Sequence, residues 1–185
     1  MKELSLNILD IAKNSVKADS TLIEITVDEN INKNLLTITI RDNGCGMSRE
    51  FLNRVKDPFT TTRTTRKVGM GIPLFELAAN QAGGKLDIES ELGKGTCVTA
   101  TFVYDSIDRA PVGDITGTMI TLISGSPKID FKYIHRVNNA EFVFDTKEVK
   151  AILGDVPLNS TDVLSWIMDY ITEGLAEIRG QNPVF

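Results

Sequence analysis

The segment Asp42-Asn-Gly-Cys-Gly-Met47 decides the fold, and two further glycine segments follow it in order, Gly69-Met-Gly-Ile72 and Gly93-Lys-Gly-Thr96. A segment with helical spacing, residues 6–18, precedes all three. Because glycine has no Cβ, it lets the backbone turn tightly and approach a flat ring or a phosphate closely. No run in the sequence has the Gly-x-x-x-x-Gly-Lys-Ser/Thr spacing of a P-loop. The order of the segments therefore predicts a nucleotide pocket of another kind.

Length and composition indicate a globular protein. The chain has 185 residues, 42% of them hydrophobic, which predicts one domain, or one with a small appendage, around a substantial core. Its net charge of −5 argues against a nucleic-acid binder, which usually has a basic surface. The apolar runs are shorter than the ~20 residues of a membrane span, and the N-terminus has no signal-peptide region. We therefore expect a cytoplasmic protein that binds neither membranes nor nucleic acids.

The cysteines and the single histidine argue against a zinc or iron–sulfur centre. Cys45 and Cys97 are far apart in the sequence, and neither belongs to a Cys-x-x-Cys pair. We interpret both as reduced, small and buried residues. His135 lies in a predicted strand, where we interpret it as a packed or surface residue and not as a phosphate acceptor.

Hydrophobic periodicity predicts helices and strands on both sides of the glycine segments. The predicted helices span residues 4–18, 48–55, 72–82, 146–153 and 160–180. The predicted strands span residues 21–28, 36–40, 85–91, 96–104, 119–123, 129–134 and 141–144. Residues 60–67, rich in Thr and Arg, have no such periodicity and predict a mobile loop.

A change of composition after Tyr104 predicts a boundary near residues 105–116. It separates residues 1–104, which contain the glycine segments, from residues 105–185. The second part is either an α+β module that binds a partner or a second copy of the chain, or a segment that packs onto the same core. In the first case its apolar helix is the expected contact surface, so a homodimer is one of the options.

Several side chains have the chemistry that a nucleotide pocket needs. Asp42 offers a carboxylate to the amino group of adenine. Asn14 offers an amide oxygen, a reasonable Mg²⁺ ligand beside phosphates and waters, and Lys17 lies three residues further on. The glycines at 69 and 71 precede a predicted helix, whose N-terminus favours phosphate, and residues 54–67 carry five cations and one anion. Taken singly, these features are better explained as an ordinary turn, a plain loop–helix junction and a polar helix face, and the cations are equally well explained as part of a solvated loop.

In their order the motifs resemble the GHKL ATP-binding superfamily, and they are most similar to histidine-kinase ATP-binding domains. The N box, the first glycine box, the F box and the second and third glycine boxes are matched by residues 9–18, 42–47, 57–63, 68–72 and 93–96. The resemblance covers residues 4–104. It implies an α+β fold, a two-layer α/β sandwich whose mixed, mainly antiparallel sheet is covered on one face by helices. A small α+β C-terminal extension would follow.

Carried over position by position, the resemblance implies a site for ATP and Mg²⁺. Asn14 would hold Mg²⁺, Lys17 would lie near phosphate, and Asp42 would accept a hydrogen bond from the adenine amino group. Residues 60–68 would form a lid over the phosphates. The residues implied to bind the nucleotide are Asn14, Lys17, Asp42, Gly44, Gly46, Met47, Phe59, Thr61, Thr62, Arg63, Gly69, Met70, Gly71, Ile72 and Thr96.

The general-base position holds Asp10, where relatives that hydrolyse ATP or phosphorylate serine have Glu four residues before the Asn. Aspartate is one methylene shorter, so Asp10 would act as the base, hold a Mg²⁺-bound water, or do neither. Because the N box begins within ten residues of the start of this sequence, we expect no helix pair with an acceptor histidine before it.

The resemblance implies a stand-alone kinase-like regulator that phosphorylates a partner protein. Two alternatives stay open. One is a slow ATPase whose nucleotide state switches a protein interaction, and the other is a non-catalytic ATP or ADP sensor. The short lid favours a histidine-kinase-like or anti-sigma-like site over that of a dimerising chaperone.

Overall fold

The computed structural model describes residues 3–56 and 70–180, which form one six-stranded sheet and a layer of helices. The strand order is β3-β4-β2-β1-β5-β6, with β1 and β5 parallel and the other neighbours antiparallel. In chain order the elements are α1 (Leu4–Lys17), β1 (Leu22–Asn30), the 3-10 helix η1 (Ile31–Lys33), β2 (Leu35–Asp42), α2 (Arg49–Lys56), α3 (Gly71–Gln81), β3 (Lys85–Glu91), β4 (Gly95–Val103), α4 (Ile115–Gly125), β5 (Asp130–Val137), β6 (Ala140–Asp145), α5 (Thr146–Leu153) and α6 (Thr161–Gly180).

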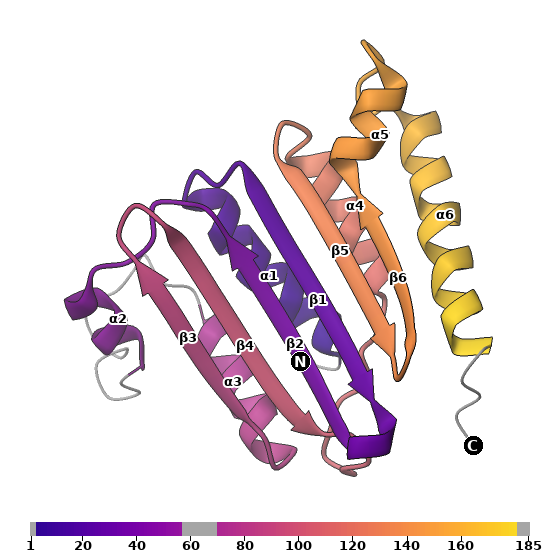
Figure 1. Ribbon diagram of the computed structural model, residues 1–185. Helices are drawn as coiled ribbons and strands as arrows, with labels where there is room; N and C mark the ends of the chain where they lie inside the picture. The colour runs from indigo at the N-terminus through magenta and orange to yellow at the C-terminus, as the bar shows by residue number, and fades with distance from the viewer. Residues whose placement is uncertain (1–2, 57–69, 181–185) are drawn as a thin grey trace.

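Helices α1, α3 and α4 lie against one face of the sheet, and α6 lies beside the edge strand β6 (Figure 1). The strands favour this arrangement because their side chains alternate between the two faces. In β1, Ile23, Ile25 and Val27 are fully buried, whereas the residues between them are partly exposed. On the open face, Thr26 of β1 is paired with Thr39 of β2. The observed fold is the α+β two-layer sandwich that the resemblance implied.

The last turn of α1 is held firmly against the ends of β1 and β2. Leu4, Ile8 and Ile11 recur at helical spacing and are buried in the core, which contributes about 1.5–3 kcal/mol for each fully buried side chain. Two hydrogen bonds tie the end of the helix to the turns beside it. The Cys45 N–H donates to the Ala18 carbonyl at 2.9 Å, and Ser20 Oγ donates to the Ser15 carbonyl at 2.7 Å.

The C-terminal part continues the same sheet. Strand β5 pairs in parallel with β1, with Tyr133 opposite Ile25, and β6 pairs with β5. Buried residues from both parts of the chain form one hydrophobic core. That residues 1–104 and 105–185 form separate domains stays a prediction, and the shared core fits the option that the second part packs onto the first.

The prediction of a strand at residues 119–123 is wrong, because these residues lie in helix α4. Ile115, Met119 and Leu122 are buried at helical spacing, and the Asp114 carboxylate caps the helix by accepting from the Gly117 N–H at 2.8 Å. The many Ile and Thr residues favour a strand locally, but packing against α1 and α6 favours the helix. Among the described helices, none has the length and apolar content needed to cross a bilayer.

Candidate functional site

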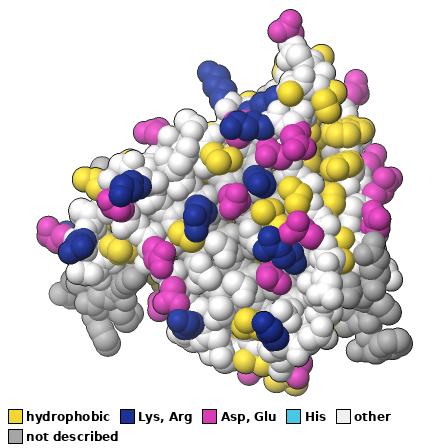
Figure 2. All heavy atoms as spheres, viewed as in Figure 1, with side chains coloured by type: hydrophobic (Ala, Val, Ile, Leu, Met, Phe, Trp, Pro, Cys, Tyr) yellow, Lys and Arg dark blue, Asp and Glu magenta, His cyan; other side chains and the backbone are white. Residues whose placement is uncertain are grey.

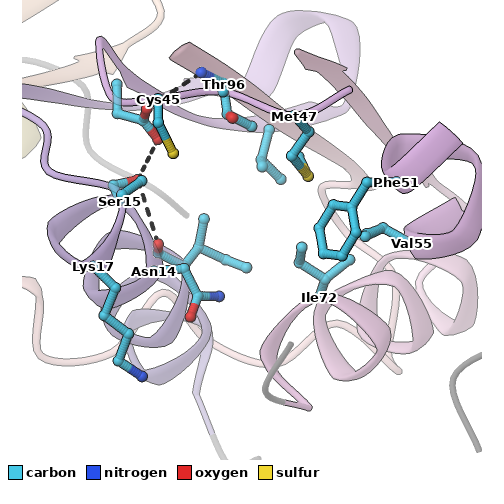
Figure 3. A pocket seen from close by; sticks show the side chains of 14 residues that line it. Asn14, Ser15, Lys17, Cys45, Met47, Phe51, Val55, Ile72 and Thr96 are labelled. Carbon is cyan, nitrogen blue, oxygen red and sulfur yellow. Dashed lines mark hydrogen bonds between the residues drawn. The ribbon is translucent and has the colours of Figure 1, made fainter. Parts of the chain in front are cut away.

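A cavity of about 240 Å³ lies between α1, α2 and α3, at the ends of β2 and β4 (Figure 3). Such a volume is near the small end of the range for small-molecule sites. The lining residues are Ile11, Asn14, Ser15, Lys17, Ala18, Asp42, Cys45, Gly46, Met47, Phe51, Val55, Ile72, Thr96 and Val98. The wall is mostly apolar, with a few polar groups from α1, β2 and β4, which is the pattern of a site that binds a flat, partly apolar ligand.

Asp42 is the buried acid of this cavity, and hydrogen bonds fix both of its carboxylate oxygens. The side chain is only 8% exposed, because β2 directs it toward the helix layer. Its Oδ2 accepts from Ser15 Oγ at 2.5 Å, and its Oδ1 accepts from the backbone N–H groups of Gly44 at 2.9 Å and Thr96 at 3.2 Å. Donors from α1, from the glycine turn and from β4 therefore set the direction of one carboxylate.

The first and third glycine segments are packed against each other. Gly46 has a φ of +64°, and a Cβ there would lie 2.0 Å from the Glu91 carbonyl oxygen. Gly95 has a φ of +109°, and a Cβ there would lie 2.0 Å from the carbonyl oxygen of Asp42. Both backbones need glycine, because L side chains rarely adopt such φ values and no space is left for a Cβ. The close contact brings the β3–β4 turn to the rim of the cavity.

Thr96 belongs to a small hydroxyl network at the same rim. Its Oγ1 lies 2.9 Å from Ser90 Oγ, and Ser90 Oγ accepts from the Met47 N–H at 2.9 Å. This network ties the Met47 backbone to β3 and β4. It therefore positions the backbone of Met47, whose side chain lines the cavity.

The far wall is apolar. Figure 3 shows Phe51, Val55 and Ile72 across the cavity from Asn14 and Ser15, with Met47 above them. Phe51 and Val55 are one turn apart on α2, and Ile72 lies in the first turn of α3. A planar ring placed between Asp42 and this wall would contact apolar groups on its face and the carboxylate at its edge.

The polar end of the cavity is built by α1 and the start of α3. Asn14 and Lys17 line the cavity from the last turn of α1. One turn earlier, Asp10 lies beside the N-terminus of α3, since a Cβ on Gly71 would be 3.0 Å from Asp10 Cβ. The N-cap residue of α3, Met70, makes no side-chain hydrogen bond to the first turn of the helix. Uncapped N–H groups at a helix N-terminus suit an anion.

The cavity brings together seven of the residues that the sequence predicted, namely Asn14, Lys17, Asp42, Gly46, Met47, Ile72 and Thr96. Gly44 is buried beneath it, Gly71 packs on Asp10, and Met70 is largely exposed. The predicted residues Phe59, Thr61, Thr62, Arg63 and Gly69, like the predicted lid, lie outside the described residues.

Sequence reasoning missed several lining residues and misplaced the cysteines. Cys45 lies in the glycine turn and is exposed at the cavity. Cys97 lies opposite Arg41 in the pairing of β2 with β4 and is half-buried. The interpretation of both cysteines as buried is therefore wrong. Ser15 was missed because it has no pattern apart from its position next to Asn14. Phe51 and Val55 have the i, i+4 spacing of one helix face, but this spacing does not predict which part of the protein that face contacts.

His135 is buried far from the cavity, at the other end of β1. Its Nε2 lies 2.7 Å from Glu29 Oε1, and its Nδ1 contacts the Tyr133 hydroxyl. The Tyr104 hydroxyl donates to Glu29 Oε2 at 3.2 Å. Burial raises the pKa of Glu29, but the hydrogen bonds and charges of His135, Arg179 and Tyr104 together lower it by more. The pKa of Glu29 therefore lies below its ordinary value. His135 is a packed strand residue within a buried polar network.

Comparisons with known proteins agree with this geometry. A family model described as histidine kinase-, DNA gyrase B- and HSP90-like ATPase matches residues 2–106. A putative sensor protein of Shewanella frigidimarina is 33% identical over 109 residues, which cover 58% of this chain and 17% of that protein. The sensor protein SrrB of Staphylococcus aureus is 38% identical over 101 residues, which cover 52% of this chain and 17% of that protein.

The match therefore spans about a sixth of the length of these curated relatives. A crystal structure of the N-terminal domain of a DNA repair protein has the same fold, with a TM-score of 0.53 and 15% identity over 84% of this chain and 58% of that one. The family model covers more than half of this chain, including every described residue of the cavity. The chain belongs to the family of histidine kinase-, DNA gyrase B- and HSP90-like ATPases.

Proposed function

We propose that the chain binds ATP with Mg²⁺ in this cavity and acts as a kinase-like regulator that phosphorylates a partner protein. The observation that carries the proposal is Asp42, a buried carboxylate at a mostly apolar cavity, fixed by donors from three segments. The amino group of adenine is a hydrogen-bond donor, which a carboxylate at the edge of the ring would accept. The match to a family model that includes histidine kinases supports a kinase-like activity, and the relatives named as sensor proteins fit a regulatory role.

The base would lie between the acid and the apolar wall. Asp42 would accept from the adenine amino group, and the Thr96 hydroxyl would contact the ring edge or a water bound to it. Met47 and Ile72 would contact the faces of the ring, which favours a flat ligand by burial of apolar area. Gly46 would let the backbone approach the ring without a Cβ between them.

The phosphates would extend toward the polar end, where Lys17 and the uncapped start of α3 favour negative charge. The amide oxygen of Asn14, in the last turn of α1, is a hard ligand of the kind that Mg²⁺ takes, so this residue fits the ion. Bound there, Mg²⁺ would neutralise phosphate charge.

Asp10 is the proposed general base for the hydroxyl or imidazole group of the acceptor. Its side chain lies at the start of α3, since a Cβ on Gly71 would be 3.0 Å from Asp10 Cβ and 3.8 Å from Asp10 Oδ2, and it lies one turn before Asn14 on α1. A base there would take the proton of the attacking group as the γ-phosphoryl group leaves ADP. The shorter Asp side chain then requires the acceptor to approach closely.

Thermal unfolding with and without Mg²⁺ and ATP tests nucleotide binding. A bound ligand raises the melting temperature by mass action, and Asp42→Ala should abolish the rise. The same melting temperature with ATP, ADP and no nucleotide would contradict the proposal at its first step.

Labelled ATP then distinguishes the activities. Label on a second protein from a cell lysate supports the kinase, and Asp10→Asn should remove that label while it preserves the thermal shift. Phosphate release without protein labelling instead indicates the slow ATPase, and binding with neither activity indicates the sensor.

A further inference from the structure

The outer face of α6 combines aromatic and acidic side chains. Helix α6 packs on the sheet and on α4 through one apolar stripe. A second set of residues recurs at i, i+3, i+4 and i+7 and so shares one face of the helix. This acidic-aromatic face consists of Asp162, Trp166, Asp169, Tyr170, Glu173 and Glu177, all of them exposed.

The aromatic part of this face is an ordered, half-exposed surface. Trp166 is 49% exposed and Tyr170 is 43% exposed, and their rings stack with centroids 5.3 Å apart and planes 18° apart. The Tyr170 ring also lies 5.6 Å from the ring of Phe142 in β6, so an aromatic row runs from the edge strand onto the helix. Figure 2 shows hydrophobic side chains gathered over β6 and α6, with acidic side chains along the outer rim. Tryptophan and tyrosine are enriched in protein interfaces.

The charges around this row are mostly negative. Within residues 3–56 and 70–180, none of the four acids of the face makes an ion pair. Asp169 and Glu173, and Glu173 and Glu177, are like-charge pairs at i, i+4, which destabilise an isolated helix. Residues 140–180 hold eight acidic and three basic residues, so this region carries the whole formal net charge of −5. The local charge is therefore concentrated beside the aromatic row.

We propose that the acidic-aromatic face docks a cationic amphipathic segment of a partner protein. Apolar side chains of that segment would cover Trp166 and Tyr170, and its Lys or Arg residues would face the acids and the rings. A second copy of the chain is a poor occupant, because a two-fold contact through this face would bring its acids together. The surface lies on the C-terminal part, so the proposal does not depend on nucleotide binding.

Trp166 is the only tryptophan of the chain, so its fluorescence reports on this face directly. The full chain is titrated with a synthetic amphipathic peptide of Leu and Lys at helical spacing. A saturable shift of Trp166 emission is expected, with a Kd that rises as salt is added. The matched peptide in which Glu replaces Lys should produce no shift.

Charge reversal on the face provides the decisive comparison. The double variant Asp169→Lys with Glu173→Lys should weaken binding of the Lys peptide by about tenfold or more. Fluorescence anisotropy of a labelled peptide measures the Kd. The control, Glu89→Lys with Asp108→Lys, changes the net charge equally at exposed positions outside residues 140–180 and should bind as the wild type does. Circular dichroism checks that both variants are folded.

Four results would overturn the proposal. One is the lack of a saturable shift with the Lys peptide, and another is equal weakening in both charge-reversal variants. Equal binding of a peptide with the same composition but no amphipathic order also counts against it. A dimer in sedimentation that Trp166→Ala dissociates would identify a second copy as the occupant and would likewise overturn it. The thermal shift with ATP is measured on the same samples, so failure here is separate from failure of nucleotide binding.

Discussion

Ser15 Oγ lies 2.5 Å from Asp42 Oδ2 and donates a hydrogen bond to it, which links the last turn of α1 to the end of β2 inside the cavity. The two residues are 27 positions apart, and both are buried. The bond holds the carboxylate against α1, while the backbone N–H groups of Gly44 and Thr96 hold its other oxygen. The proposed contact with adenine therefore depends on a serine that lies within the N box but was not predicted as a site residue.

Replacement of this serine should weaken ATP binding. Ser15→Ala removes one donor to a buried carboxylate, and a hydrogen bond to a charged group contributes about 1.5–3 kcal/mol. We expect the Kd for ATP, measured by calorimetry, to rise about tenfold or more. Ser5→Ala is the matched control, because Ser5 is buried in the same helix and its Oγ has no partner among the described residues. Equal affinities of the two variants would show that the bond to Asp42 does not orient the site.

Gly46 should tolerate no side chain. In Gly46→Ala the new Cβ would meet the Glu91 carbonyl oxygen at a φ that alanine adopts with difficulty, so the turn must move. We expect a loss of at least about 1–3 kcal/mol in the free energy of unfolding, together with loss of the thermal shift by ATP. Denaturant unfolding and the melting temperature measure both effects.

Gly93→Ala is the control for this change. Gly93 also has a positive φ of +79°, but a Cβ there would meet nothing within 4 Å. We expect only the smaller backbone cost, about 1 kcal/mol, with the thermal shift by ATP preserved. If both variants keep the shift, the close contact of the two glycine segments is not needed for the site.

The glycine turns, Asp42 and Thr96 could be placed from the sequence, because each follows an alternating strand with a clear end. The cavity itself depends on contacts between distant segments, such as that of Gly95 with Asp42. Hydrophobic periodicity predicts helices and strands but not these contacts. The parallel pairing of β5 with β1 is equally long-range, so the sequence left the packing of the C-terminal part open. For α4, the content of Ile and Thr predicted a strand, and tertiary packing overrode it.

The buried network around Glu29 should make stability depend on pH. The pKa of Glu29 in the folded chain lies below the ordinary 4.5, so the ionised carboxylate stabilises the folded state. This stabilisation is fully present at pH values above 4.5. It is lost as the pH falls through the folded-state pKa, so the free energy of unfolding should decrease on acidification below about 4.5. Glu29→Gln removes the titrating group that faces His135, Tyr104 and Arg179, and should flatten this decrease.

Urea unfolding at a series of pH values measures the effect. Glu24→Gln makes the same chemical change on the open face of the same strand, and separates a specific role of Glu29 from a general change of charge. A slope in Glu29→Gln as steep as that of the wild type would assign the acid sensitivity to other groups.

Gly174 should determine how closely α6 packs on β6. A Cβ on Gly174 would lie 2.1 Å from the Phe142 ring, so alanine must displace either the ring or the helix. Overpacking of this kind costs about 1–3 kcal/mol, although alanine favours the helix itself by about 1 kcal/mol. We expect a lower melting temperature and a changed Trp166 emission, because the Tyr170 ring contacts both Phe142 and Trp166. Gly180→Ala, where a Cβ would meet nothing within 4 Å, should change neither.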